Sequence, residues 1–309
     1  MSAAGQPGPV PAGLIFVGGT GRSGTHIVGR LLGTHPRFAD VPIEARFHCN
    51  KRGLGDLLEG RVSLGGFLAK LREFWWHRVR VDDQPRGLYN LMTRARFDEA
   101  ADRFETGYHD DPVPACRRLF MDLLGGVADG EDKPGLVEMS SHNVKEAQTL
   151  RRLFPEARFV HTVRDGRDSA SSVTTKTWGP DRIPAAIDWW ADRLRAIEDG
   201  VRGEEDGDAL TLGSGRLHTV VLDDLVAGDR EAAYARLLAF LGVRDEAPIR
   251  HFFDEEMSPA AANRGRWANG LGPIGRARVR RKYERTLGSL AHEGNHVAAA
   301  LTDAYERLG

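Results

Sequence analysis

The sequence predicts an α/β fold in which helices surround a central parallel sheet and a mostly helical insert interrupts the pattern. Short apolar runs alternate with helix-length amphipathic segments, which is typical of parallel strands joined by helices. A glycine-rich loop follows the first apolar run, and residues 50–133 leave the alternation and are rich in arginine and aromatic side chains. We therefore expect one domain over residues 1–309, with a flexible leader at 1–13, the insert at 50–133 and C-terminal helices at 276–309.

Strands are expected where a short apolar run ends at a glycine or a polar residue. These runs are 14–17, 135–140, 157–163 and 217–226, and a further short strand within the loop 35–46 is left open. Helices are expected where apolar residues recur every three or four positions between breaking residues. They are 26–32, 143–154, 183–200, 230–243 and the region from 276 onward, whereas 254–275 is irregular and 203–215 is a solvated loop.

Composition and charge narrow the classes of function. A net charge of -1 argues against a polyelectrolyte partner such as nucleic acid. No apolar run approaches the ~20 residues of a membrane span, and the first residues lack the features of a secretory signal. Cys49 and Cys116 form neither a disulfide framework nor a metal-binding spacing. We therefore expect a cytoplasmic protein without stable membrane insertion, with the oligomeric state open and a homodimer among the alternatives.

The loop after the first strand has the glycine spacing of a phosphate-binding loop but not its lysine. An ATP-type loop reads G-x-x-x-x-G-K-S/T, and its backbone N–H groups at the helix start bind phosphate. Gly19 and Gly24 have this spacing, but Thr25 and His26 stand where the lysine and the magnesium-binding hydroxyl belong. Arg22, inside the loop, is the nearest cation. The pattern indicates a P-loop-type three-layer fold with an anion site and no metal.

This loop, G-T-G-R-S-G-T-H, resembles the 5′-phosphosulfate loop of the sulfotransferases that use 3′-phosphoadenosine 5′-phosphosulfate (PAPS). In that family, a Lys or Arg before S-G-T reaches the phosphosulfate, which implies this role for Arg22. The segment R-D-G-R-D-S-A-S-S resembles the family's 3′-phosphate segment, which implies that Arg164 and Ser172 hold the ribose 3′-phosphate. Taken alone, R-D-G-R-D is equally consistent with a solvated salt-bridge cluster.

The resemblance extends, with weaker matches, from Leu14 to Leu271 outside the insert. The segment N-R-G-R-W-A-N-G-L at 263–271 is similar to a late basic loop that closes over the 3′-phosphate. The full set of donor-binding residues that the resemblance implies is Gly21, Arg22, Ser23, Gly24, Thr25, His26, Arg164, Ser172, Arg264 and Gly265. For His26, an ordinary helix-start residue remains an equal alternative.

Glu44 is the candidate general base. The segment E-A-R at 44–46 resembles the E-T-R glutamate of the tyrosylprotein-sulfotransferase-like branch. Burial would raise the pKa of such a carboxyl and help it to take a hydroxyl proton, although an ordinary ion pair with Arg46 is an alternative. His142 is the rival base, because the small-molecule branch carries a catalytic histidine in this neighbourhood. His48 is a more distant candidate and is more typical of a structural residue.

One departure from the family concerns the cation near the leaving group. Many relatives carry a lysine where this sequence reads Met139-Ser140-Ser141. The alternatives are that Arg22 suffices, that Lys176 reaches the site, or that turnover is slow.

The resemblance implies a PAPS-dependent sulfotransferase that acts on a hydroxyl by in-line displacement and releases 3′-phosphoadenosine 5′-phosphate (PAP). The insert would form the acceptor side, with Phe74, Trp75, Trp76 and Tyr89 as candidate walls for a small aromatic molecule or natural product, a glycan or a lipid. A PAPS- or PAP-binding protein with little catalysis and a nucleotide-dependent phosphotransferase are the alternatives.

Overall fold

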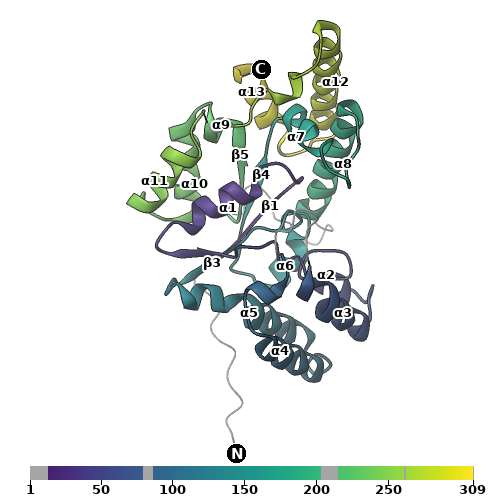
Figure 1. The fold of residues 1–309 in the computed structure, drawn as a ribbon, viewed down its shortest axis with the longest axis vertical. Helices are drawn as coiled ribbons and strands as arrows, with labels where there is room; N and C mark the ends of the chain where they lie inside the picture. Colours follow the sequence, from purple (N-terminus) through teal and green to yellow (C-terminus); the bar gives the residue numbers. More distant parts are fainter. Residues whose placement is uncertain (1–12, 79–85, 203–214, 261, 309) are drawn as a thin grey trace, which may run out of the picture.

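The structure is a computed structural model that describes residues 13–78, 86–202, 215–260 and 262–308 (Figure 1). Almost all of the predicted leader and of the predicted loop at 203–215 lies outside these residues. Within them, five parallel strands form one sheet in the order β2-β3-β1-β4-β5. The strands are β1 (Leu14–Gly19), β2 (Phe38–Asp40), β3 (Gly135–Glu138), β4 (Arg158–Val163) and β5 (Leu217–Val221).

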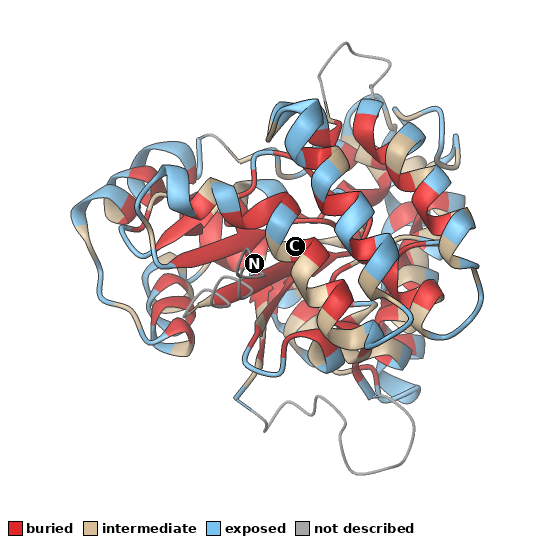
Figure 2. Cartoon of the chain, turned by 90° about the horizontal axis from the view of Figure 1, so that it is seen from below, coloured by how far each residue is buried: buried red, intermediate tan, exposed pale blue. Residues whose placement is uncertain are grey.

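Helices cover both faces of this sheet and make three layers, which confirms the predicted fold class. Successive side chains of a strand point to opposite faces, and in β1 Leu14 and Phe16 pack into one core while Ile15 and Val17 pack into the other. Helices α5 (Pro112–Gly130) and α6 (Ala147–Leu153) cover the first face. Helices α1 (Thr25–Gly33), α10 (Arg230–Leu241) and α11 (Ala247–Glu256) cover the second. Burial on both faces explains why the strands are continuous apolar runs. Figure 2 shows the buried strands between helices whose outer faces are exposed.

The helices fall into three groups along the chain. Those between β2 and β3 are α2 (Leu54–Leu58), α3 (Leu64–Lys70), the π-helical turn η1 (Leu71–Trp75), the 3-10 turn η2 (Leu88–Asn90), α4 (Arg94–Gly107) and α5 (Pro112–Gly130). Those next to the strands are α1 (Thr25–Gly33), α6 (Ala147–Leu153), α7 (Gly166–Val173), α8 (Ile183–Arg202), α9 (Leu222–Val226) and α10 (Arg230–Leu241). The last are α11 (Ala247–Glu256), η3 (Arg266–Ala268), α12 (Pro273–His292) and α13 (Ala298–Leu308). None of the described helices has the length and apolar character of a membrane span.

Several predicted element boundaries are wrong. The strand predicted at 135–140 ends at Glu138, and α11 and α12 extend into the two ends of the predicted irregular segment 254–275. The helix predicted at 143–154 begins at Ala147, because the Asn143 side chain bonds to the carbonyls of Val17 and Glu138 and holds a turn there. The strand predicted at 217–226 ends at Val221, and α9 follows it. The aspartates at the start of α9 favour a helix N-terminus over a strand.

The strand order locates the site. After β1 the chain adds β2 and then β3 on one side of β1, with β3 between β1 and β2, and it later adds β4 and β5 on the other side. A crevice therefore opens at the carboxyl end of β1, where α/β sheets of this kind bind ligands. The glycine loop, Arg164 and Asp223 all follow strand ends at this edge.

Candidate active site

The loop from Thr20 to Gly24 has a backbone suited to an anion. Gly21, Arg22 and Gly24 have φ angles of 83°, 60° and 96°. A Cβ atom on Gly24 would lie 2.7 Å from Cδ2 of Leu222, so both the φ angle and the space require glycine there. Helix α1 begins at Thr25 with no acidic residue in its first turn, which leaves the positive end of its dipole available.

A cavity of about 330 Å³ lies beside this helix start. Six of the predicted donor-binding residues line it: Arg22, Gly24, Thr25, His26, Arg164 and Arg264. They come from three segments that are distant in the sequence, and the structure brings them together. The volume lies at the lower end of the ~300–1,000 Å³ typical of ligand pockets.

The two predicted phosphate motifs also touch each other. Nε of Arg22 donates to Oγ of Ser172 at 2.8 Å. Ser23 differs from the expectation of a ligand-binding hydroxyl, because its Oγ is fully buried and lies 3.2 Å from Oγ1 of Thr162 on β4. The Ser23 hydroxyl therefore fastens the loop to the sheet.

The first turn of α7 holds the late basic loop. Arg164 donates to the carbonyl of Asn263, and the Asp168 carboxylate accepts from the amides of Gly265 at 2.7 Å and Trp267 at 3.2 Å. Asp168 is buried, so these bonds are shielded from water. The predicted contact residue Gly265 thus has its amide occupied by protein. Asp168 is the second aspartate of R-D-G-R-D, and the sequence did not single it out as a functional residue. It positions the loop that carries Arg264.

A second acidic residue, Asp223, joins the same region. It follows β5, it is buried, and Oδ2 accepts from the amide of Asp165 at 2.8 Å. Its Oδ1 lies 3.3 Å from Nε of Arg264. The D-D pair at the strand end was the sequence signal for this residue.

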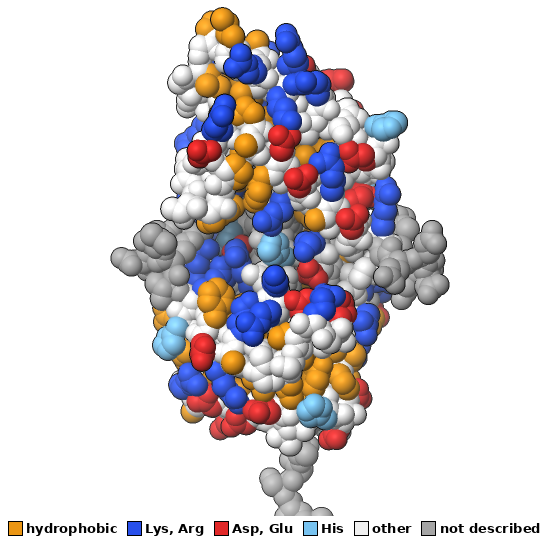
Figure 3. Space-filling model, turned by 90° about the vertical axis from the view of Figure 1, so that its right-hand side faces the viewer, with side chains coloured by type: hydrophobic (Ala, Val, Ile, Leu, Met, Phe, Trp, Pro, Cys, Tyr) orange, Lys and Arg blue, Asp and Glu red, His pale blue; other side chains and the backbone are white. Residues whose placement is uncertain are grey.

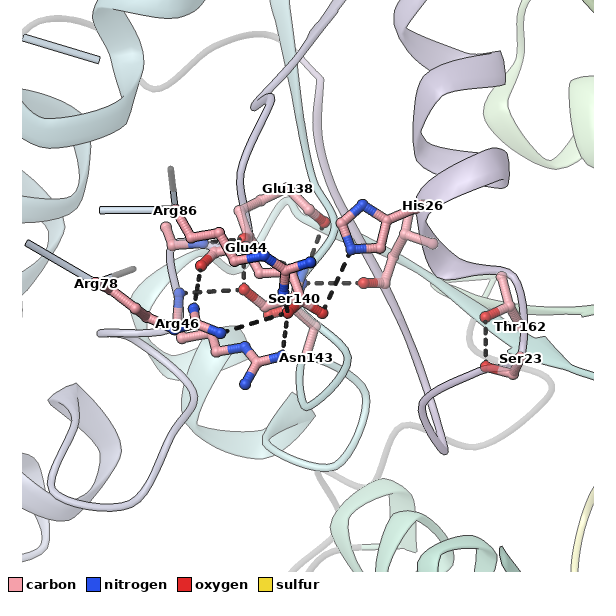
Figure 4. Close-up of polar contacts among 12 residues, drawn as sticks. Ser23, His26, Glu44, Arg46, Arg78, Arg86, Glu138, Ser140, Asn143 and Thr162 are labelled. Atoms are coloured by element: carbon pink, nitrogen blue, oxygen red, sulfur yellow. Dashed lines mark hydrogen bonds and ion pairs between the residues drawn. The ribbon is translucent and has the colours of Figure 1, made fainter. Parts of the chain in front are cut away.

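Glu44 is buried inside a ring of basic side chains (Figure 4). His26 Nε2 lies 3.7 Å from its carboxylate, and Arg78 and Arg86 lie at 3.8 Å and 3.7 Å. Arg46 makes a direct ion pair with it. Burial alone would raise the pKa of Glu44, but the His26 hydrogen bond and the charges of Arg46, His26 and Arg78 outweigh burial and lower it to about 2. The prediction of a raised pKa is therefore wrong.

His142 lies nearby with both ring nitrogens engaged. Nη1 of Arg193 lies 2.9 Å from Nε2, and Nδ1 lies 2.7 Å from the Asn50 Oδ1. Because an arginine can only donate, Nε2 accepts and Nδ1 carries the proton. Burial and the charges of Arg193 and Arg46 lower the pKa of His142 to about 4. This imidazole is neutral and its basic nitrogen is occupied.

His48 belongs to a buried network around Glu138, at the end of β3. The carboxylate of Glu138 accepts from the amide of Ala45 at 3.2 Å, from the Ser140 hydroxyl at 2.6 Å and from His48 Nε2 at 3.0 Å. Burial would lower the pKa of His48, but the neighbouring Cys49 and Glu138 raise it well above its usual value, which favours a charged imidazole beside the Glu138 carboxylate. The network fixes the backbone next to Glu44 and gives His48 a structural role. A charged residue at the end of an apolar strand was the only sequence signal for it.

Replacing Glu138 by Gln is expected to lower the free energy of unfolding by about 3 kcal/mol, because it leaves a buried imidazolium without its partner. The matched control is Glu231→Gln, which breaks an exposed pair with Arg250 and should cost less than about 1 kcal/mol. Urea unfolding of both variants measures the difference. Equal losses would mean that the buried pair contributes no more than a surface pair.

Met139, at the position of the family lysine, is buried against α1. A Cβ on Gly29 would lie 3.0 Å from its side chain, and only 1% of Met139 is exposed. Position 139 therefore supplies no charge to the site. Of the candidate acceptor walls, Trp75 and Trp76 are packed in the core, whereas Phe74 and Tyr89 are exposed.

Residues 14–247 match a family model described as the sulfotransferase family. Protein-tyrosine sulfotransferase 1 of Mus musculus is 30% identical over 163 residues, which are 53% of this chain and 34% of that protein. Protein-tyrosine sulfotransferase 2 of Gallus gallus is 27% identical over 241 residues, which are 77% of this chain and 53% of that protein. The chain thus spans about half, or less, of the length of these curated relatives.

Two solved structures share the fold. One is the sulfotransferase domain from the Synechococcus PCC 7002 olefin synthase, with a TM-score of 0.51 and 19% identity over 91% of this chain and 97% of that chain. The other is the sulfotransferase domain from the curacin biosynthetic pathway, with a TM-score of 0.52 and 16% identity over 90% and 97%. The resemblance drawn from the two motifs is thereby confirmed, and the chain belongs to the sulfotransferase family.

Proposed function

We propose that the protein transfers a sulfuryl group from PAPS to a hydroxyl group of a small-molecule, glycan or lipid acceptor and releases PAP. The observation that carries the proposal is the meeting of Arg22, Arg164 and Arg264 around one cavity at the start of α1. Arg22 and the α1 amides suit the 5′-phosphosulfate, and Arg164 and Arg264 suit a separate 3′-phosphate. This distribution of charge fits a nucleotide with phosphates at two positions better than a triphosphate.

The chemistry that these residues support is in-line transfer, in which the protein positions the reactants and stabilises charge. Arg22 neutralises the charge that develops on the leaving 5′-phosphate. Glu44, with a pKa of about 2, is ionised at every pH of interest and is a weak base. It therefore accepts the hydroxyl proton late, once bonding to sulfur has made the hydroxyl acidic.

Glu44 is favoured over His142 as the base. His26 lines the donor cavity and also contacts the Glu44 carboxylate, so Glu44 adjoins the donor site. The basic nitrogen of His142 accepts from Arg193 and has no free lone pair for a substrate proton.

Calorimetric titration with PAP, and with ATP as the control, both without magnesium, tests the proposal. We expect PAP to bind at least tenfold more tightly than ATP, because only PAP carries a 3′-phosphate for Arg164. Equal affinities, or a preference for ATP, would contradict the assignment and favour a nucleotide-dependent phosphotransferase.

A PAP-binding protein with little catalysis is the second candidate, and the buried Met139 favours it. Incubation with PAPS and a panel of hydroxyl acceptors separates the two. Tight PAP binding without sulfated product across phenols, sugars and lipid alcohols would favour the binding protein.

A further inference from the structure

Arg193, on the inner side of α8, has an unusual set of neighbours. Its Nη1 donates to His142 at 2.9 Å, and its guanidinium carbon lies 4.7 Å from the centre of the Trp189 ring. Among the described residues, no carboxylate pairs with it. Two positions further along, Arg195 pairs with Asp192 and Glu293 at 2.9 Å and 2.7 Å. Arg202, at the end of the same helix, pairs with Glu198 at 2.7 Å. Among the three arginines of α8, Arg193 therefore differs in having no carboxylate partner within the described residues.

The neighbours of Arg193 do not offset its charge. His142 is neutral, as shown above, and an indole ring supplies only a weak attraction. Burial and, as a smaller effect, the charge of Arg46 lower the pKa of Arg193. A half-buried cation without a counter-ion is unfavourable, and such groups in a cleft are candidates for binding an anion.

The position of this cation is on the acceptor side of the donor loop. A Cβ on Gly21 would lie 3.9 Å from Cη2 of Trp189, so the ring on which Arg193 stacks lies next to the loop. On the other side, His142 joins Arg193 to Asn50, at the start of the insert. Figure 3 shows basic side chains around the middle of the right-hand side of Figure 1, the side on which α8 lies.

Arg46 is a second cation in this region, near enough for its charge to lower the pKa of both Arg193 and His142. Its side chain pairs with Glu44, but its Nε is buried and has no hydrogen-bond partner. Its φ of 61° is a left-handed conformation that a non-glycine residue rarely adopts, and such strain clusters at functional sites. The amide of Arg46 bonds to Ser140 Oγ at 3.1 Å, which holds this conformation.

We propose that Arg193, with Arg46 beside it, forms an anion site that binds a carboxylate, sulfate or phosphate group of the acceptor. The inference rests on the proposed function, in which the charges of the donor are met by Arg22, Arg164, Arg264 and the α1 amides. The surplus charge near Glu44 then belongs to the acceptor. The acceptor therefore carries a negative group next to the hydroxyl that receives the sulfuryl group.

Titration of inorganic sulfate into the PAP-saturated protein tests the site, because PAP occupies the two phosphate positions of the donor. We expect one saturable sulfate site that Arg193→Gln weakens at least tenfold. The matched control Arg195→Gln, on the same helix, should leave sulfate affinity unchanged, and Arg193→Lys should retain part of it. Unchanged PAP affinity in each variant shows that the fold and donor site are intact.

A second titration, with PAPS in place of PAP, identifies which anion Arg193 serves. Sulfate that still binds supports a site for the acceptor's own negative group. Sulfate that PAPS excludes would mean that Arg193 serves the transferring sulfuryl group, and the acceptor site would be overturned. Absence of sulfate binding, or equal binding by Arg193→Gln, would overturn it as well. Failure of PAP to bind would instead count against the proposed function.

Discussion

Replacing Glu44 by Gln is expected to lower kcat by about 10²–10⁴-fold and to change PAP affinity less than twofold. The amide keeps the size of the side chain but cannot take a proton. Glu44 is not among the residues that line the described donor cavity, and His26 lies between the two, so the nucleotide should bind as before. Turnover of PAPS and calorimetry with PAP measure the two quantities.

The matched variant is His142→Gln, which removes the rival base. We expect it to retain more than a tenth of the activity. Full activity in Glu44→Gln together with loss of activity in His142→Gln would reverse the assignment.

The pH dependence of kcat/KM gives a second readout of the same assignment. A lowered pKa means that Glu44 gains its proton only near pH 2, so it should produce no acid limb between about pH 5 and pH 7. A base with a raised pKa would lose activity in that range as the pH falls. An acid limb in this pH range that the unmodified protein shows and Glu44→Gln lacks would contradict the lowered pKa of Glu44.

Replacing Arg164 by Ala is expected to weaken PAP binding by about 10²-fold, because it removes charge-assisted hydrogen bonds to a phosphate. Arg164 also bonds to the carbonyl of Asn263, so a loss of affinity has two explanations, direct contact and loop position. Adenosine 5′-phosphate, which lacks the 3′-phosphate, separates them by calorimetry. Direct contact predicts a large loss for PAP and a small one for adenosine 5′-phosphate.

Equal losses for the two nucleotides would mean that Arg164 acts through the loop at 263–267. Arg164→Lys is the matched variant, since it keeps the charge but not the planar fork. We expect it to bind PAP with intermediate affinity.

Much of the fold, and the grouping of Arg22, Arg164 and Arg264 around one cavity, could be predicted from the sequence because the signals are local. The buried strands are contiguous apolar runs, and the anion-binding loop and R-D-G-R-D each lie within a few consecutive residues. The turn at 140–146 was missed because Asn143 bonds to Val17, 126 positions away. Helix propensity is a weak signal against such a contact.

The surroundings of Glu44 could not be predicted, for the same reason. Arg78 is 34 positions from Glu44, yet it donates to the Glu44 carbonyl. The sequence suggested burial and, as the alternative, an ion pair with Arg46. The structure shows both, and burial acts on the pKa in the opposite direction to the arginine charges. The ion pair of His48 and Glu138 spans 90 positions and leaves no periodic pattern.

The Glu138 network also allows the proposed acceptor side of the site to change while the donor side stays in place. It ties the amide next to Glu44 and, through Asn143, the end of β1 to the same buried point of the sheet. The segment that we propose for the acceptor side begins only after this anchor. A different segment between 50 and 133 would change which acceptor is chosen and how strongly arginines tune Glu44. The distance from Glu44 to the donor loop would stay the same, so acceptor choice can diversify without rebuilding the transfer chemistry.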